Sequence, residues 1–274
     1  MIKLSRYDLI RLGLLCLLVT SSAAAAKDIR YALVIGNASY AIDALANPIN
    51  DAQDISDKLK QLDFNVETHL DIDKTSIAKT IENFYRNITD RDAVSVFYYA
   101  GHAIQLNNNN YLIPVDANIS SLNSLDSEAY GFNQLLLNMH KARSRTNIVI
   151  LDACRNNPFI AQGAGENNRS LSTESTATNN GLAPIEAPPG TLIAYATEPG
   201  KVAKDCAGRN GTYTRYLLKY LSLPVGIEKM FKTVRAAVMQ ETGNSQVPWE
   251  HSSLYRDFMF KRDEASDVPN IPSF

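Results

Sequence analysis

Several features that identify common classes of protein are scarce in this chain. It has three cysteines and four histidines in 274 residues, too few for a disulfide framework or a cysteine- and histidine-rich zinc site. Its 27 lysines and arginines nearly cancel 29 aspartates and glutamates, so net charge favours neither nucleic acid nor an anionic membrane as partner. Internal repeats, a glycine-rich phosphate loop and EF-hand spacing are absent. What remains is a globular chain whose 45% hydrophobic residues can build a substantial core.

Residues 1–26 have the pattern of an export signal. Three basic residues precede a short apolar stretch at 12–19 and a run of small residues at 21–26. The apolar stretch is shorter than the ~20 residues that a membrane span needs. We therefore expect cleavage after Ala26 and a periplasmic or secreted protein; an uncleaved N-terminal membrane anchor is the alternative.

Removal of this segment would leave two cysteines, Cys154 and Cys206. The third, Cys16, follows the bulky Leu15, where a lipoprotein signal would have a small residue, so lipidation is not expected. Cys154 and Cys206 could pair in an oxidising compartment. A bridge would disable Cys154 as a nucleophile, and the residues that flank Cys154 favour that other role.

Strand-like and helix-like segments alternate along the rest of the chain. Alternation of this kind predicts a three-layer α/β/α sandwich with a mostly parallel central sheet. The expected helices are residues 51–62, 75–87 (with Asp73 as N-cap), 134–141, 213–221 and 227–240. The expected strands are residues 31–35, 64–70, 93–99, 147–151, 191–196 and a closing strand at 254–260.

Three stretches break the alternation. Residues 162–189 are rich in small and polar residues and should form a flexible surface loop. The asparagine run at 107–110 predicts the turn of a hairpin within residues 103–113. The charged, proline-containing tail at 263–274 should fray. We expect one domain over residues 27–262.

Two residues with reactive side chains follow expected strands directly, at the carboxyl ends where parallel sheets bind their ligands. His102 follows the third expected strand and Cys154 follows the fourth, so both should open into one crevice if these strands are neighbours. A thiolate is a nucleophile, and a neighbouring imidazole raises the thiolate fraction and can protonate a leaving amine. Singly, such a cysteine is more often a small buried hydrophobe and such a histidine an ordinary core or surface residue. The pair favours nucleophilic catalysis.

The strings around this pair are YYAGH at 98–102 and LDACRN at 151–156. The 52 residues from 102 to 154 agree with the ~50 that separate histidine from cysteine in caspase-type enzymes. The strings resemble the histidine and cysteine boxes of the caspase-like peptidases, most closely the paracaspase and metacaspase branch and the bacterial proteins that carry this domain. The resemblance extends over residues 27–260, with further matches in ALVIGN at 32–37, NDA at 50–52, LIPVD at 112–116 and GTLIAYAT at 190–197.

The resemblance implies a role for each residue of this site. Cys154 would attack the scissile carbonyl, and His102 would act as acid and base. The backbone N–H groups of Cys154 and of the residue after His102 would form the oxyanion hole. That residue is usually glycine in the family and is Ala103 here, which keeps its N–H but adopts positive φ less readily than glycine.

The resemblance also implies a specificity. Caspases that cut after aspartate have glutamine where this chain has Asp152, whereas the paracaspase and metacaspase branch has an aspartate there and another matching Asp51, both in the S1 pocket. Two carboxylates favour a cationic P1 side chain, so we expect cleavage after Arg and then Lys. Asp205 could add a third acid. Alternatively, Asp51 is a first-turn helix acid and Asp152 a buried carboxylate bonded to a backbone amide.

Other possibilities remain open at this point. Arg169 is the only basic residue of the loop at 162–189, so the enzyme could cut itself there, or the loop is an insertion without a regulatory role. We expect no cofactor; calcium, which some metacaspases use, is the alternative that the resemblance leaves open. Proteins or peptides with a basic P1 residue are the expected partners. The competing functions are a catalytically weak caspase-fold scaffold or binding module, and peptide ligation by the same dyad.

Overall fold

The computed structural model of this chain describes residues 28–90, 92–107, 109–119, 121–154, 182, 185–198 and 208–262. Several expectations therefore lie outside the described residues. They concern the signal at 1–26, most of the loop at 162–189 with Arg169, the residues Asp205 and Cys206, and the tail at 263–274.

A mostly parallel sheet forms the middle layer of the fold. Its strands are β1 Arg30–Gly36, β2 Asn65–Leu70, β3 Val94–Leu106, β6 Thr146–Cys154, β7 Thr191–Tyr195 and β8 Trp249–Ser252. They lie in the order β2-β1-β3-β6-β7-β8, and every neighbouring pair is parallel except β7 with β8. The central strands come from continuous apolar runs because both of their faces are buried.

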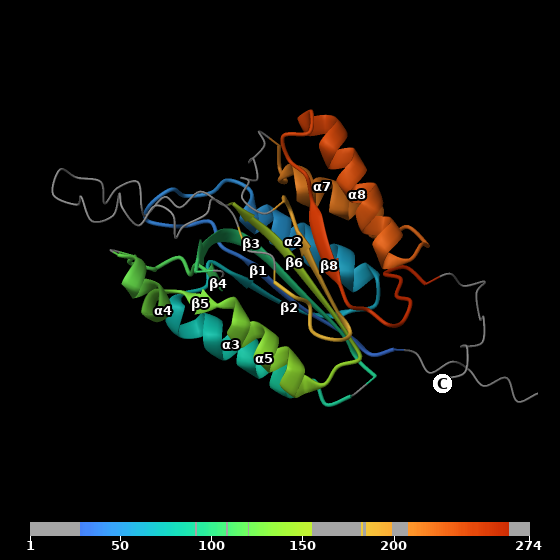
Figure 1. Cartoon of the computed structure of the whole chain (residues 1–274), viewed down its shortest axis with the longest axis horizontal. Coiled ribbons are helices and arrows are strands. Elements are labelled where there is room, and N and C mark those ends of the chain that lie inside the picture. Colours follow the sequence, from blue (N-terminus) through green and yellow to red (C-terminus); the bar gives the residue numbers. More distant parts are fainter. Residues whose placement is uncertain are drawn as a thin grey trace, which may run out of the picture. The chain divides into compact units, whose positions relative to one another are not determined.

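Helices cover both faces of this sheet (Figure 1). They are α2 Pro48–Gln61, α3 Lys74–Asn87, α5 Phe132–Ala142, α7 Thr212–Tyr220 and α8 Ile227–Thr242. The helices α2, α7 and α8 pack on one face, and α3 and α5 pack on the other. The expected three-layer sandwich is thus confirmed. Among the described helices, none combines the length and the apolar character that crossing a membrane requires.

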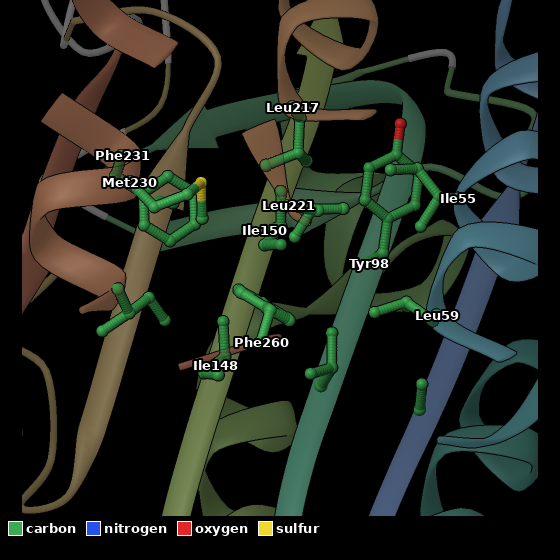
Figure 2. Packing of buried hydrophobic residues seen from close by; sticks show 14 of the residues in the cluster. Ile55, Leu59, Tyr98, Ile148, Ile150, Leu217, Leu221, Met230, Phe231 and Phe260 are labelled. Carbon is green, nitrogen blue, oxygen red and sulfur yellow. The ribbon is translucent and has the colours of Figure 1, made fainter. Parts of the chain in front are cut away.

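The core beneath α2, α7 and α8 fixes the helices that surround the candidate site. Side chains of β3 and β6 pack with side chains of the three helices, and Phe260 belongs to the same cluster (Figure 2). Full burial of one such side chain contributes about 1.5–3 kcal/mol. Each of the following is at most 2% exposed: Ile55, Leu59, Tyr98, Ile148, Ile150, Leu217, Leu221, Met230, Phe231 and Phe260.

The expected hairpin exists, but its turn is shorter than the asparagine run. β3 continues past the end of the parallel sheet and pairs in antiparallel fashion with β4 Asn109–Leu112. Because Leu106 pairs with Asn109, only two residues connect the two strands. Asn107 takes a φ of 50°, which asparagine tolerates better than most residues. Three short elements follow: η1 Leu122–Ser124, α4 Leu125–Glu128, and β5 Tyr130–Gly131, which pairs with β4.

The closing strand expected at residues 254–260 is wrong, because these residues form no strand and β8 ends before them at Ser252. Residues beyond β8 make bonds of another kind. The carbonyl of Phe258 accepts from the first N–H of α8 at 2.8 Å, and the carbonyl of Phe260 accepts from the Arg30 guanidinium at 2.6 Å. A helix start and a side chain thus satisfy carbonyl groups that a strand would have offered to a neighbour. The apolar residues of this stretch belong to the core without forming a strand.

Candidate active site

His102 and Cys154 lie at the same level of two neighbouring strands. β3 and β6 are parallel neighbours, and the last pair of their register joins His102 to Cys154. Neighbouring strands lie about 4.8 Å apart, so the two main chains are adjacent at the carboxyl edge of the sheet. The expectation that these strands are neighbours is confirmed. The main chain of Cys154 ends β6, whereas its side chain lies outside the described part of the structure.

The imidazole of His102 is buried, and its two nitrogens have different roles. Nε2 lies 2.7 Å from the main-chain carbonyl oxygen of Asp43, and the Asp43 carboxylate lies 3.8 Å away. A carbonyl oxygen can only accept, so Nε2 is the donor. In the neutral ring the lone pair is then on Nδ1, the nitrogen that can take a proton. The loop after β1 that contains Asp43 was not identified from the sequence, because a main-chain carbonyl leaves no signal in the residue type.

The backbone at Ala103 is suited to donate toward β6. The carbonyl of His102 accepts from the N–H of Ile113, which lies on the β1 side of β3, since Asn37 at the end of β1 donates to the Ile113 carbonyl at 3.1 Å. The peptide between His102 and Ala103 is trans, so its N–H points opposite to its carbonyl and hence toward the β6 side. Ala103 is not among the residues with positive φ. Alanine in place of the usual glycine therefore brings no backbone strain here.

Asp51 and Asp152 converge on Gly211, which precedes the first turn of α7. Asp51 lies in the first turn of α2, is 3% exposed, and accepts from the Gly211 N–H at 3.1 Å. Asp152 lies on β6, two residues before Cys154, and its Oδ2 accepts from the Thr214 hydroxyl at 2.6 Å. A Cβ on Gly211 would lie 3.3 Å from Asp51 Oδ2 and 3.7 Å from Asp152 Oδ2. Three distant segments of the chain thus bring two carboxylates to one point.

Two buried tyrosines lie close enough to Asp51 and Asp152 to be affected by the negative charge of these carboxylates. The single hydroxyl proton of Thr214 goes to Asp152, so Tyr98, whose hydroxyl lies 2.6 Å from Thr214 Oγ1, is the donor in that bond. Burial, and then the charges of Asp152 and Asp51, raise the pKa of Tyr98 well above its ordinary value. Burial and Asp152 likewise raise the pKa of Tyr213. Both phenols therefore keep their protons, and a cation would complement the carboxylates between them.

Residues 208–211, the segment that leads into α7, are hydrogen-bonded to α2 and to the residue before it. The Arg209 guanidinium donates twice to Asp54, at 2.9 and 2.8 Å, and this bond lowers the pKa of Asp54. The amide of Asn47 donates to the carbonyls of Gly208 and Arg209 at 2.7 and 3.1 Å. The sequence did not identify these anchors, because nothing in it couples residue 54 to residue 209. They hold Gly211 beside Asp51.

The remaining predicted site residues are not placed by the structure. Asp205 and Cys206 lie outside the described residues, so neither a third acid nor a bridge to Cys154 is tested. In the part of the chain that the structure describes, no group of three or more His, Cys, Asp or Glu side chains is arranged to hold a metal ion.

Comparison with known proteins finds similarity in sequence and in fold. A family model described as "Caspase domain" matches residues 29–259. The mouse "Mucosa-associated lymphoid tissue lymphoma translocation protein 1 homolog" is 33% identical over 132 residues, which are 47% of this chain and 15% of that protein. The human protein of that name is 31% identical over 138 residues, 50% of this chain and 16% of that protein. The chain thus spans about a sixth of the length of these curated relatives.

A solved caspase structure has a similar fold. The crystal structure of caspase-1 from Spodoptera frugiperda superposes with a TM-score of 0.63 and covers 88% of this chain and 92% of that one, at 17% identity. At this identity the likeness concerns the fold alone. The family model, however, spans most of the residues between the N-terminal segment and the tail. This protein therefore belongs to the caspase-domain family of cysteine peptidases.

Proposed function

We propose that this protein is an endopeptidase that cleaves after Arg and, less well, after Lys, with Cys154 as nucleophile and His102 as acid and base. The observation that carries the specificity is the convergence of Asp51 and Asp152 on Gly211. Asp152 is only two residues from Cys154 on the same strand, so a side chain bound between the acids has its carbonyl close to that residue. The acids would then form the floor of the S1 pocket.

The chemistry follows from the groups at the two strand ends. Nδ1 of His102 takes the proton of the Cys154 thiol, and the thiolate sulfur bonds to the scissile carbonyl carbon. The N–H groups of Cys154 and Ala103 stabilise the negative charge that develops on the carbonyl oxygen. The C–N bond breaks as the imidazolium gives its proton to the leaving amine. Water then attacks the thioester and releases the acid, with His102 as base.

Arginine fits the two acids better than lysine does. A planar guanidinium presents five N–H donors and can bond to carboxylates that approach from two directions, whereas an ammonium is a compact point charge that bonds less specifically. An acidic P1 side chain would meet two like charges. A neutral side chain would bring no positive charge to either carboxylate and so would gain no ion pair.

A set of fluorogenic peptides that differ only at P1 tests this proposal. We expect kcat/KM to fall from Arg to Lys by about tenfold, and from Arg to Gln, Leu or Asp by about 1,000-fold or more. The assay is run with and without a thiol reductant, because a bridge between Cys154 and Cys206 would mask the nucleophile. Preferred cleavage after Asp or Leu would contradict the specificity. No cleavage of any peptide in reductant would favour the scaffold alternative.

Gly211→Ala should narrow the pocket from the side of α7. The added methyl carbon would lie 3.3 Å from Asp51 Oδ2 and 3.7 Å from Asp152 Oδ2. It would therefore occupy space that the P1 cation is expected to fill. The backbone at Gly211 (φ −58°, ψ 154°) accepts any residue, so the effect is confined to the pocket. We expect KM for the P1-Arg peptide to rise about 10- to 100-fold, as measured by steady-state kinetics.

Gly226→Ala is the matched control for this substitution. Gly226 precedes α8 with nearly the same backbone (φ −55°, ψ 147°), and a Cβ there meets no atom within 4 Å. Its KM should equal that of the wild type. Equal KM values for Gly211→Ala and Gly226→Ala would show that no P1 side chain enters between the two acids.

A further inference from the structure

The main chain on both sides of His102 is held by two buried tyrosine hydroxyls. The Tyr40 hydroxyl accepts from the N–H of His102 at 2.9 Å and donates to the carbonyl of Ile113 at 3.0 Å. The Tyr99 hydroxyl lies 2.8 Å from the carbonyl oxygen of His102 and 2.9 Å from that of Ile113. The two hydroxyls are 3.3 Å apart. Both peptide groups that flank His102 thus have a tyrosine as partner.

Gly101 makes this approach possible. A Cβ at Gly101 would lie 2.7 Å from the Tyr40 hydroxyl and 2.8 Å from the Tyr99 hydroxyl, closer than atoms can pack. Its φ of 154° is also one that other residues rarely adopt. The glycine of the YYAGH string therefore leaves space for hydroxyls that bond to the next residue.

The bond from Tyr99 also determines where the next N–H points. Tyr99 has one proton for two carbonyl oxygens, and the Ile113 carbonyl already accepts from Tyr40 and Asn37, so the proton is assigned to the bond with the His102 carbonyl. Together with the Ile113 N–H, this bond directs the His102 carbonyl to the β1 side of β3. Because the peptide is planar and trans, the Ala103 N–H is directed to the β6 side, where Cys154 ends its strand. Burial, and then the neighbouring Tyr40, raise the pKa of Tyr99, so its hydroxyl keeps the proton that it donates.

Tyr40 acts on the side chain of His102 as well. Its ring lies 4.4 Å from the imidazole, centroid to centroid, at a tilt of 54°. The imidazole is thus held by the Tyr40 ring and by the Asp43 carbonyl at Nε2. The loop that supplies Tyr40 is itself fixed by Asp71, whose carboxylate accepts from the Ala38 and Ser39 N–H groups at 2.8 and 2.9 Å.

We infer that Tyr40 and Tyr99 are positioning residues for catalysis: they hold the peptide groups around His102 so that the imidazole and the Ala103 N–H keep the orientation that the reaction needs. The inference rests on the proposed function. Their hydroxyls bond to main-chain groups of His102 and Ile113, whereas Asp51 and Asp152 converge on Gly211. They should therefore affect turnover and leave recognition of the P1 cation unchanged.

The test uses Tyr99→Phe and Tyr40→Phe, each of which removes one hydroxyl and keeps the ring. A misdirected oxyanion donor should lower kcat by about 10- to 100-fold, since complete loss of one donor costs about 100- to 1,000-fold. KM should stay within about twofold, because ground-state binding is unchanged. Tyr85→Phe is the control, because Tyr85 is also buried and its hydroxyl lies near Ser95, which is seven residues before His102 on β3.

Two inhibitors separate positioning from a general structural defect. A peptide aldehyde with Arg at P1 forms a thiohemiacetal whose oxygen occupies the oxyanion hole, so its Ki should rise by the same factor as kcat falls. Agmatine carries the guanidinium without a carbonyl and reports the S1 pocket alone, so its Ki should not change. An unchanged aldehyde Ki, or an equal rise in both Ki values, would overturn the inference.

The outcomes remain distinct if one variant does not fold or the wild type is inactive. Tyr40→Phe alters a loop residue and Tyr99→Phe a strand residue, so each is an independent arm. Two folded variants with the kinetics of Tyr85→Phe would overturn the inference and leave the proposed peptidase intact. A wild type that hydrolyses no peptide and binds no aldehyde would overturn the proposed function, and this inference with it.

Discussion

Cys154→Ala should lower kcat for a P1-Arg peptide by about 10⁴-fold or more, the largest effect of any substitution in this chain. Without the sulfur no acyl-enzyme can form, and the oxyanion donors and the S1 acids can at most accelerate direct attack by water. His102→Ala should cost nearly as much, because the thiol then has no base and the leaving amine no acid. The two losses should not add, since the residues act as one unit.

Single-turnover hydrolysis of a fluorogenic P1-Arg peptide measures this effect, with circular dichroism to verify folding. Cys206→Ala is the control, because it removes the other cysteine outside the first 26 residues. It should retain full activity in the presence of reductant. A Cys154→Ala protein that keeps more than about 1% of wild-type kcat would mean that another group is the nucleophile.

Asp152→Asn and Asp51→Asn should each lower kcat/KM for Arg substrates by about 100-fold or more. The amide keeps the shape of the carboxylate and removes its charge, so the P1 guanidinium would be buried against a neutral group. Asp152→Asn can also keep the bond from Thr214, since an amide oxygen accepts as a carboxylate does. The loss of kcat/KM should be much smaller for substrates with a neutral P1 residue. The kcat/KM values for Arg substrates and for neutral substrates should therefore become more alike.

Asp57→Asn is the matched control for the acidic pair. Asp57 lies on the same helix as Asp51 and is exposed, with Lys60 as its partner at 3.0 Å. Removal of its charge changes the net charge equally and should leave the ratio of Arg to Leu cleavage unaltered. If all three variants lowered kcat/KM alike, only a general electrostatic attraction would remain, and the proposed S1 pocket would be wrong.

Much of the architecture could be predicted because it depends on local pattern. Continuous apolar runs identified β1, β3, β6 and β7 apart from their exact ends, since burial on both faces leaves little room for polar residues, whereas β2 is a mostly polar and exposed edge strand. The pairing of His102 with Cys154 followed from the position of each at a strand end, where parallel strands present their last residues to one edge. The helical spacing of α2 likewise placed Asp51 near its start.

The parts that escaped prediction depend on groups without a residue-specific signal or on distant partners. The bond between His102 Nε2 and the Asp43 carbonyl involves a main-chain oxygen that every residue has. The strand expected at 254–260 failed because its carbonyls bond to Arg30 and to the start of α8, which lie far away in the chain. The bond between Arg209 and Asp54 was not predicted for the same reason, since 155 positions separate the two residues in the chain.

The most direct test of the central claim is active-site labelling with a peptidyl chloromethyl ketone that has Arg at P1. The reagent must bind its guanidinium at the acids and react with an activated thiolate nearby, so it probes both halves of the site at once. Peptide mapping by mass spectrometry should find one adduct, on Cys154, which is lost in His102→Ala and strongly reduced in Asp152→Asn. Equal labelling by an analogue with Asp at P1, or an adduct elsewhere with Cys154 unmodified, would contradict the account.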